Sequence, residues 1–328
     1  MRVKSMRVVV LLTALTLTPT GCGKAGPSTS QIDGSVRERL GSLTRGAASV
    51  RGQRLLQPKP VARFYEARKG THAWEGKDAE EIVRAIRGIE ADGLNPAEYH
   101  LETIERLMKE SENAASPALA ADLDILLTDA VAGMMDHVWY GRVRPVSLNP
   151  AWNVDSREGA PPLEVTVARI AEAGSPGDGI EATKPKHFIY VGLKGALANL
   201  REIATKGGWP TVRSGRPIKP GGTDPRIPSI RARLAATGEL NGGSGGTSTV
   251  YDPGLRKAVE LFQAHNRLDA NGIIGKEEIA AMNVSAAARA DQVRVNMERA
   301  RWVLPGLKDD FLLVNLPAFK AYLIRGGK

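Results

Sequence analysis

The chain has 328 residues, of which 42% are apolar and 25% charged, enough to bury a sizeable core in about two domains. Aromatic residues make up only 5%, beside 35 glycines and 20 prolines, which favours helices joined by long loops over an all-β sandwich. The formal net charge of +9 suits any polyanion, but the basic residues are dispersed without a run of aromatics, so we expect no nucleic-acid partner.

The first 21 residues have the pattern of an export signal. Arg2, Lys4 and Arg7 form a positive start, and Val8 to Leu17 is an apolar stretch that is too short to span a bilayer as a mature helix. We therefore predict a signal peptide over residues 1–21 and an exported, periplasmic protein.

The only cysteine of the chain follows this segment. Pro19-Thr20-Gly21-Cys22-Gly23 resembles a bacterial lipoprotein box, in which a small residue precedes a cysteine that becomes lipidated and then forms the new N-terminus. Leu is usual where Pro19 stands. Cys22 is thus the predicted lipidation site and membrane anchor, and the mature chain is expected to have no intramolecular disulfide. The alternative is an ordinary signal peptide with an incidental cysteine, and it also predicts export.

A helical domain is predicted after a tether. Residues 22–57 are rich in Gly, Ser, Arg and Gln with weak helical periodicity, which indicates a tether with a loosely held helix. The periodicity then sharpens, and residues 58–215 are predicted to form a helical domain whose longest helix runs from about Pro117 to Trp139. Two more helices are expected between residues 163 and 206, and a Pro/Gly-rich run up to Asp224 marks a domain boundary.

Residues 225–283 are predicted to form a compact unit of three helices. The first is expected from Ile227 to Leu240, the second after an N-cap at Asp252, and the third from Lys276 to Met282. The tight loop 271–275, with a glycine at two of its five positions, introduces the third helix.

This unit carries the most specific motif of the chain. It contains Phe262-Gln263, Leu268, Asn271 to Gly275 and Ile279 to Asn283. The pattern resembles the peptidoglycan-binding module found beside many wall hydrolases and transpeptidases. The resemblance implies peptidoglycan as the partner, and we expect the ligand surface between the first two helices of the unit.

Three residues are candidate peptidoglycan contacts: Tyr251, Gln263 and Asn271. Each belongs to a type that more often has a structural role in such a unit. The alternatives are a generic three-helix bundle without a ligand, or a module that serves only as a spacer.

The resemblance extends in both directions from the unit. Its further motifs are Phe64 to Arg68, Ala73-Trp74, Ala91 to Leu94, Tyr99-His100, Gly141 to Val143, Gly208 to Pro210, Pro228 to Leu240, Asn296 to Arg299, Arg301-Trp302 and Leu313 to Phe319. From about residue 60 onward they are similar to the scaffold and the first catalytic-domain strands of large exported L,D-transpeptidases. The family's reaction, as the resemblance implies, is acyl transfer through a cysteine thiolate that cross-links peptidoglycan in cell-wall biogenesis.

The chain itself carries no catalytic signature. It lacks a His…Ser-His-Gly-Cys type motif, which Cys22 cannot replace, and its five histidines have no metal-ligand spacing. We therefore predict no catalytic residues, no metal and no cofactor. Residues 284–328 are expected to be a linker helix and a short β hairpin, a fragment of a β-rich catalytic domain that is otherwise missing.

The sequence thus predicts a mainly α protein with a helical scaffold domain and a three-helix module. The leading hypothesis is the non-catalytic N-terminal portion of an L,D-transpeptidase, truncated at the start of its catalytic domain, which binds or positions peptidoglycan in cross-linking and cell-wall remodelling. The alternative is a non-enzymatic, peptidoglycan-binding envelope lipoprotein.

Overall fold

A mainly α fold is confirmed by the computed structural model of the chain. Cys22 and the predicted signal peptide lie outside the residues it describes. In the described part, none of the helices combines the length and apolarity needed to cross a bilayer. The described residues are 26–43, 48–114, 116–153, 157, 159–241, 246–307, 310–315 and 319–326.

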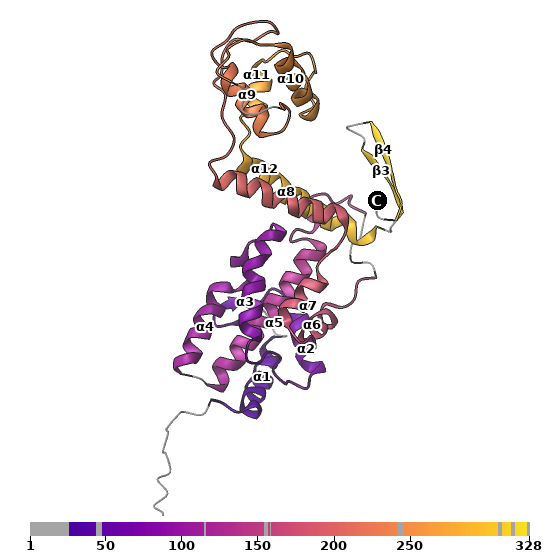
Figure 1. The fold of residues 1–328 in the computed structure, drawn as a ribbon. Helices are drawn as coiled ribbons and strands as arrows, with labels where there is room; N and C mark the ends of the chain where they lie inside the picture. The colour runs from indigo at the N-terminus through magenta and orange to yellow at the C-terminus, as the bar shows by residue number, and fades with distance from the viewer. Residues whose placement is uncertain are drawn as a thin grey trace, which may run out of the picture.

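The first part of the chain forms a helical body around one long helix, α5 (Pro117–Tyr140), which agrees with the predicted range (Figure 1). Ser116 caps its N-terminus by accepting a hydrogen bond from the Leu119 amide at 3.1 Å. The helices around α5 are α1 (Thr29–Leu43), α2 (Pro58–Ala67), α3 (Asp78–Gly88), α4 (Leu101–Asn113), α6 (Leu163–Ala171) and α7 (Pro176–Thr183). Short elements complete the body: the 3-10 helices η1 (Ile89–Asp92), η2 (Pro96–Tyr99) and η3 (Pro145–Ser147), and the antiparallel strands β1 (Ser49–Val50) and β2 (Gln53–Arg54).

Helix α1 lies within the segment predicted as a tether and belongs to the helical body. It buries Val36 and Leu43 in the main hydrophobic core. Arg39 of α1 and Arg51 of the β1–β2 turn both form ion pairs with Asp122 of α5. Because the periodicity of α1 is weak, these tertiary contacts stabilise it more than its own propensity does. The packed body therefore begins inside the predicted tether.

Helix α7 is a difference from the sequence prediction, which has two helices where the structure has α6, α7 and a third helix, α8 (Phe188–Thr205). Ser175 caps α7 by accepting a hydrogen bond from the Asp178 amide at 3.1 Å. The helix buries Pro176 and Ile180. Because only these two positions of α7 are buried, its sequence shows no helical period from which the helix could be predicted.

Asp129 of α5 binds two other segments of the body. Its carboxylate accepts hydrogen bonds from the amides of Leu56 and Gln57, each at 2.8 Å. It also lies 2.7 Å from Nε2 of the buried His100. Asp129 is completely buried, so this one carboxylate holds the chain before α2 and the start of α4 against the central helix.

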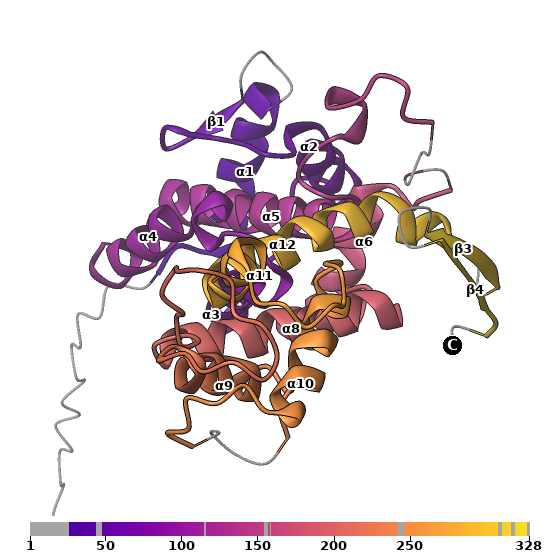
Figure 2. The same cartoon turned by 90° about the horizontal axis from the view of Figure 1, so that it is seen from above.

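Two long helices join the body to the rest of the chain. Helix α8 leads away from the body, and α12 (Ala286–Val303) returns beside it (Figures 1 and 2). We call α8 and α12 the helix pair. Tyr190, Leu197, Ala290 and Met297 form its buried core. Residues 206–285 are therefore inserted between two helices that pack against each other, and we call the folded part of this segment the inserted unit.

Asp92, at the end of η1, anchors the helix pair on the body. Its buried carboxylate lies 3.0 Å from Nζ of both Lys184 and Lys194, and the Tyr190 hydroxyl donates to it at 3.0 Å. Burial by itself would raise the pKa of Asp92, but the two lysines outweigh burial and hold the pKa below its usual value. Arg301 of α12 donates to the backbone oxygen of Asp92. Both helices of the pair are thus fixed to one residue.

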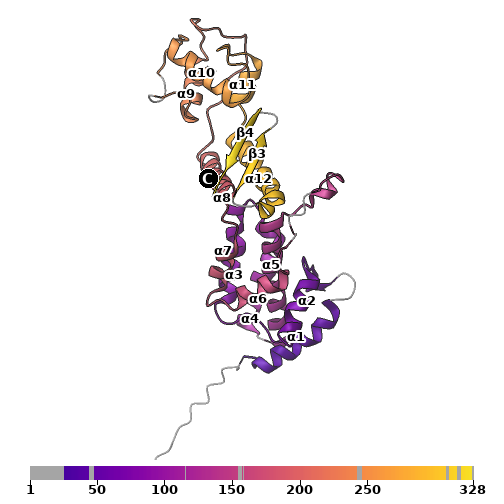
Figure 3. The ribbon, with the colours of Figure 1, turned by 90° about the vertical axis from the view of Figure 1, so that its right-hand side faces the viewer.

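The inserted unit has its own core and lies at the far end of the helix pair from the body (Figure 3). Its helices are α9 (Ile227–Ala236), α10 (Pro253–His265) and α11 (Lys276–Met282). Helix α9 ends before the predicted Leu240, because Gly238 adopts a positive φ of 85°. The predicted N-cap of α10 is confirmed, since Asp252 accepts a hydrogen bond from the Leu255 amide at 2.8 Å.

After α12 and the 3-10 helix η4 (Leu304–Gly306), the strands β3 (Phe311–Asn315) and β4 (Lys320–Ile324) form the predicted hairpin. The strands are antiparallel, with Leu313 opposite Tyr322. Most of their apolar side chains are exposed. The hairpin contributes to none of the three hydrophobic cores among the described residues.

We predict that replacing Asp129 with alanine destabilises the body strongly. The change leaves the amides of Leu56 and Gln57 without an acceptor and the buried His100 without its partner, so the free energy of unfolding should fall by about 3 kcal/mol or more. Urea denaturation measures this change. Asp291→Ala, on the exposed side of α12, should shift it by less than about 0.5 kcal/mol. Equal losses in the two variants would contradict the role given to Asp129.

Candidate functional site

The side chain of Gln263 is the centre of a polar network in the inserted unit. It is completely buried on α10. Its Nε2 lies within hydrogen-bond distance of three acceptors: Asn271 Oδ1 at 3.1 Å, the Ile273 oxygen at 3.0 Å and Glu278 Oε1 at 3.2 Å. Its Oε1 accepts from the Gly272 amide at 2.9 Å. Gln263 therefore uses both ends of its amide to hold the loop before α11.

Tyr251 and Glu278 hold the same loop from two other sides. The Tyr251 hydroxyl donates to the Gly272 oxygen at 2.6 Å, and Glu278 Oε2 accepts from the Gly275 amide at 2.7 Å at the start of α11. Burial raises the pKa of Tyr251 above its ordinary value, so the hydroxyl stays a donor. Gly272 has a φ of 73°, which a side chain would strain. Ile274 of this loop is completely buried in the core.

The three candidate contacts thus meet at one loop, but they differ in exposure. Tyr251 and Gln263 are buried, with 1% and 0% of their surface exposed. Asn271 is exposed, and its Oδ1 accepts from the Ile273 amide at 2.8 Å. Of the three, Asn271 is the residue that a polymer could touch directly. The peptidoglycan contacts of all three residues stay a prediction.

The two connections between the inserted unit and the helix pair are tied together at the base of the unit. The Asn283 amide group accepts from the Val212 amide and donates to the Val212 oxygen, both at 2.8 Å. The guanidinium of Arg233 lies 4.4 Å from the ring centroid of Trp209 and donates through Nε to the Met282 oxygen at 2.7 Å. The incoming and outgoing segments are therefore fixed to each other and to α9. The sequence motif includes Trp209 but does not show that Arg233 packs on it.

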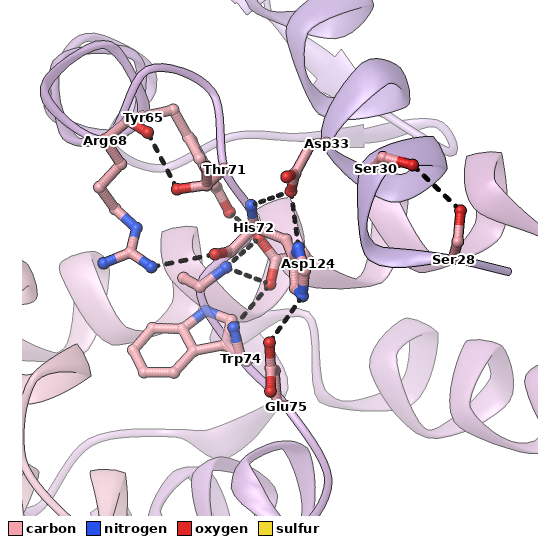
Figure 4. Close-up of polar contacts among 11 residues, drawn as sticks. Ser28, Ser30, Asp33, Tyr65, Arg68, Thr71, His72, Trp74, Glu75 and Asp124 are labelled. Atoms are coloured by element: carbon pink, nitrogen blue, oxygen red, sulfur yellow. Dashed lines mark hydrogen bonds and ion pairs between the residues drawn. The ribbon is translucent and has the colours of Figure 1, made fainter.

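A second polar cluster surrounds Asp124 of α5 in the helical body (Figure 4). Its carboxylate accepts from the Tyr65 hydroxyl at 2.5 Å and from the amides of Ala73 and Trp74 at 3.0 and 2.9 Å. Burial raises the pKa of Asp124, and these hydrogen bonds partly oppose that rise. The geometry is that of a clamp for the segment between α2 and α3. It leaves little of the carboxylate for a ligand.

His72 links this cluster to α1 (Figure 4). Its Nδ1 lies 2.7 Å from Asp33 Oδ1, which also accepts from the His72 amide at 2.9 Å, and its Nε2 lies 3.2 Å from Glu75. Burial alone would lower the pKa of His72, but the hydrogen bond to Asp33 and the charges of Asp124, Asp33 and Glu75 raise it above its usual value. Burial would also raise the pKa of Asp33, yet its bonds to His72 lower it.

The other histidines lie apart from one another. Among the described residues, no group of three or more His, Cys, Asp or Glu side chains is placed to hold a metal ion. The nearest ring or charge partners are Asp129 for His100, Tyr99 for His137, Phe188 for His187 and Glu239 for His265.

Comparison with known families identifies two parts of the chain. The model described as "Scaffold domain" matches residues 59–197, from α2 into α8. The model described as "Putative peptidoglycan binding domain" matches residues 223–282, which include α9 to α11 and the loop held by Gln263. No curated protein matches the chain. The inserted unit is thus similar to peptidoglycan-binding domains, which supports peptidoglycan binding and a location at the cell wall.

We predict that Gln263→Leu destabilises the inserted unit. Leucine has a similar size but leaves the Gly272 amide and the Ile273 oxygen without the partner that Gln263 provides, so the loss should be about 2 kcal/mol or more. Hydrogen exchange of the α10 and α11 amides measures the loss of stability within the inserted unit. Gln292→Leu on the exposed side of α12 is the matched control. Unchanged stability with lost peptidoglycan retention would instead make Gln263 a ligand contact.

We also predict that the contact between α1 and the body weakens as pH rises. The raised pKa of His72 gives a stabilisation that is present below about pH 6.5, the usual pKa, and is lost as pH rises through the higher folded value. The lowered pKa of Asp33 gives a contribution that is present above about pH 3.8. Limited proteolysis of α1 and the free energy of unfolding between about pH 5 and pH 9 test this dependence.

His72→Gln should remove most of this slope, whereas His265→Gln, whose side chain is 58% exposed, should retain it. Asp124 faces the same imidazole, and its raised pKa also makes the free energy of unfolding fall as pH rises. The two histidine variants both keep Asp124, so the difference between them isolates the contribution of His72. Identical pH profiles for the two variants would refute the role of His72.

Proposed function

We propose that this chain is the non-catalytic N-terminal portion of an L,D-transpeptidase, which binds or positions peptidoglycan during cross-linking and cell-wall remodelling. The observation that carries the proposal is the match to a peptidoglycan-binding domain over residues 223–282, where buried side chains hold the motif loop. The scaffold-domain match in front of it fits the architecture of that family.

The β3–β4 hairpin supports a place beside a β-rich domain. Leu312, Leu313 and Val314 are consecutive residues of β3, with exposed fractions of 62%, 45% and 53%. Since consecutive residues of a strand point to opposite faces, both faces of the hairpin are apolar. This pattern is typical of strands that are covered on both faces within a larger sheet. A β-rich catalytic domain would supply that cover.

The chemistry that we propose for the chain itself is binding. Acyl transfer needs a nucleophile, a base within hydrogen-bond reach and donors for the oxyanion, and the one cysteine of the chain stands in the predicted lipoprotein box. We propose export to the periplasm and a lipid anchor at Cys22. The proposed layout is a lipidated N-terminal segment whose helix α1 packs on the scaffold, the scaffold itself over 58–215, a module over 225–283 and a linker with first strands over 284–328.

The second candidate is a peptidoglycan-binding envelope lipoprotein without an enzymatic partner domain. The lipoprotein-type sequence around Cys22 fits this candidate as well as the first. Sequencing the transcript past the codon for Lys328 separates the two candidates. A continuing frame with a His…Ser-His-Gly-Cys type motif supports the transpeptidase, and a long non-coding stretch supports the lipoprotein.

We predict that the purified chain without its first 25 residues sediments with insoluble peptidoglycan sacculi at low salt. Added salt should reduce the bound fraction, because the shortened chain, which lacks Arg2, Lys4, Arg7 and Lys24, still has a net charge of +5 (9 − 4) whose attraction salt screens. Asn271→Ala should lower retention severalfold, whereas Asn113→Ala, at another exposed position, on α4, should not. Absence of retention at low salt would refute a wall-binding role.

A further inference from the structure

A cavity of about 510 Å³ lies in the helical body, between the C-terminal half of α5, helix α6 and the segment that precedes α6. Its lining includes Trp139 and Tyr140 of α5, and Leu163, Thr166 and Arg169 of α6. The volume is in the range of roughly 300–1,000 Å³ that is typical of sites for small ligands. No part of the proposed function uses this cavity.

The aromatic wall of the cavity is held in place. Trp139 donates through Nε1 to the Thr183 oxygen at 2.8 Å, which fixes the plane of its indole. Tyr140 lies 4.6 Å from the guanidinium of Arg157, measured to the ring centroid. Arg157 in turn pairs with Asp136, which is buried on α5. A wall held in this way binds a ligand without a large loss of side-chain entropy.

Arg169 gives the cavity a cation at its rim. The residue is exposed on α6, and the described residues place no carboxylate within ion-pair distance of its guanidinium. Asp136, the buried carboxylate of the lining, is already bound by Arg157 and by Gln57 Nε2 at 3.0 Å. The unmatched charge of the described lining is therefore positive, and the planar fork of a guanidinium can bind a carboxylate of a sugar-peptide polymer through two hydrogen bonds.

We propose that this cavity is a second peptidoglycan site, which receives one sugar-peptide unit of the polymer. The apolar face of a sugar ring would pack on Trp139, and Arg169 would pair with a carboxylate of the attached peptide. The choice of ligand rests on the proposed function, whereas the cavity, its aromatic wall and its cation do not. Two sites on one polymer strand would raise retention beyond that of either site alone.

The test uses fluorine NMR of the chain without its first 25 residues, labelled with 5-fluorotryptophan. The chain has five tryptophans, and Trp139→Phe and Trp209→Phe assign the two resonances that matter. Trp139 reports on the cavity and Trp209 on the inserted unit, where it packs on Arg233. The probe is a soluble disaccharide-tetrapeptide. We expect a saturable shift of the Trp139 resonance.

Arg169→Gln should weaken the binding seen at Trp139 about tenfold, the effect of losing one charge-assisted pair. It should leave any shift at Trp209 unchanged. Arg299→Gln, exposed on α12, removes the same charge and should have no effect at Trp139. Thr166→Phe fills the cavity from α6 and should abolish the Trp139 shift, with circular dichroism checking that the helices persist.

The outcomes separate the cavity from the proposed function. A shift at Trp209 alone, or sacculus retention with no shift at Trp139, overturns the cavity site and leaves the wall-binding role intact. Equal weakening by Arg169→Gln and Arg299→Gln also overturns it. A Trp139 shift that Arg169→Gln weakens, in a chain that sacculi do not retain, supports the cavity and refutes the role proposed for the inserted unit.

Discussion

The helical body depends on carboxylates buried along α5. A charged group inside a protein is strongly destabilising unless donors surround it. Asp122, Asp124 and Asp129 each meet this requirement with donors or cations from other segments. Asp129 binds the chain before α2, and Asp124 binds the chain after it. Because the buried carboxylates need these donors and the donors need an acceptor, the central helix α5 positions the chain on both sides of α2.

Polar groups that bind several segments at once also connect the body to the inserted unit. Asp92 holds α8 through Lys194 and Tyr190, and its backbone oxygen accepts from Arg301 of α12. At the far end of the helix pair, Asn283 ties the outgoing connection to the incoming one. The inserted unit is thus held at both of its ends, and Figure 3 shows the helix pair between it and the body. A scaffold built in this way can present a wall-binding unit at a set distance.

Three surfaces of the described chain bear on the proposals made for it. The motif loop exposes Asn271, the cavity presents Trp139 and Arg169, and the hairpin presents apolar side chains. Their chemistries differ: polar and aromatic groups suit a sugar-peptide polymer, whereas apolar strand faces suit a folded domain. This division fits the proposed function, in which the motif loop and the cavity bind a polymer and the hairpin packs against a protein domain.

The sequence by itself determined the elements whose signals are local. The apolar stripe of α5, the Asp252 N-cap and the glycines of the motif loop each act within a few residues, so the central helix, the start of α10 and the loop follow from pattern. The motif also indicated the inserted unit and named Gln263. The tertiary structure decided what these elements do. The buried side chain of Gln263 holds the motif loop by hydrogen bonds, α1 packs in the core of the body, and α8 packs against α12. Such roles depend on partners that lie far away in the chain, as Arg301 does from Asp92, and sequence spacing carries no information about which distant polar groups will share one buried site.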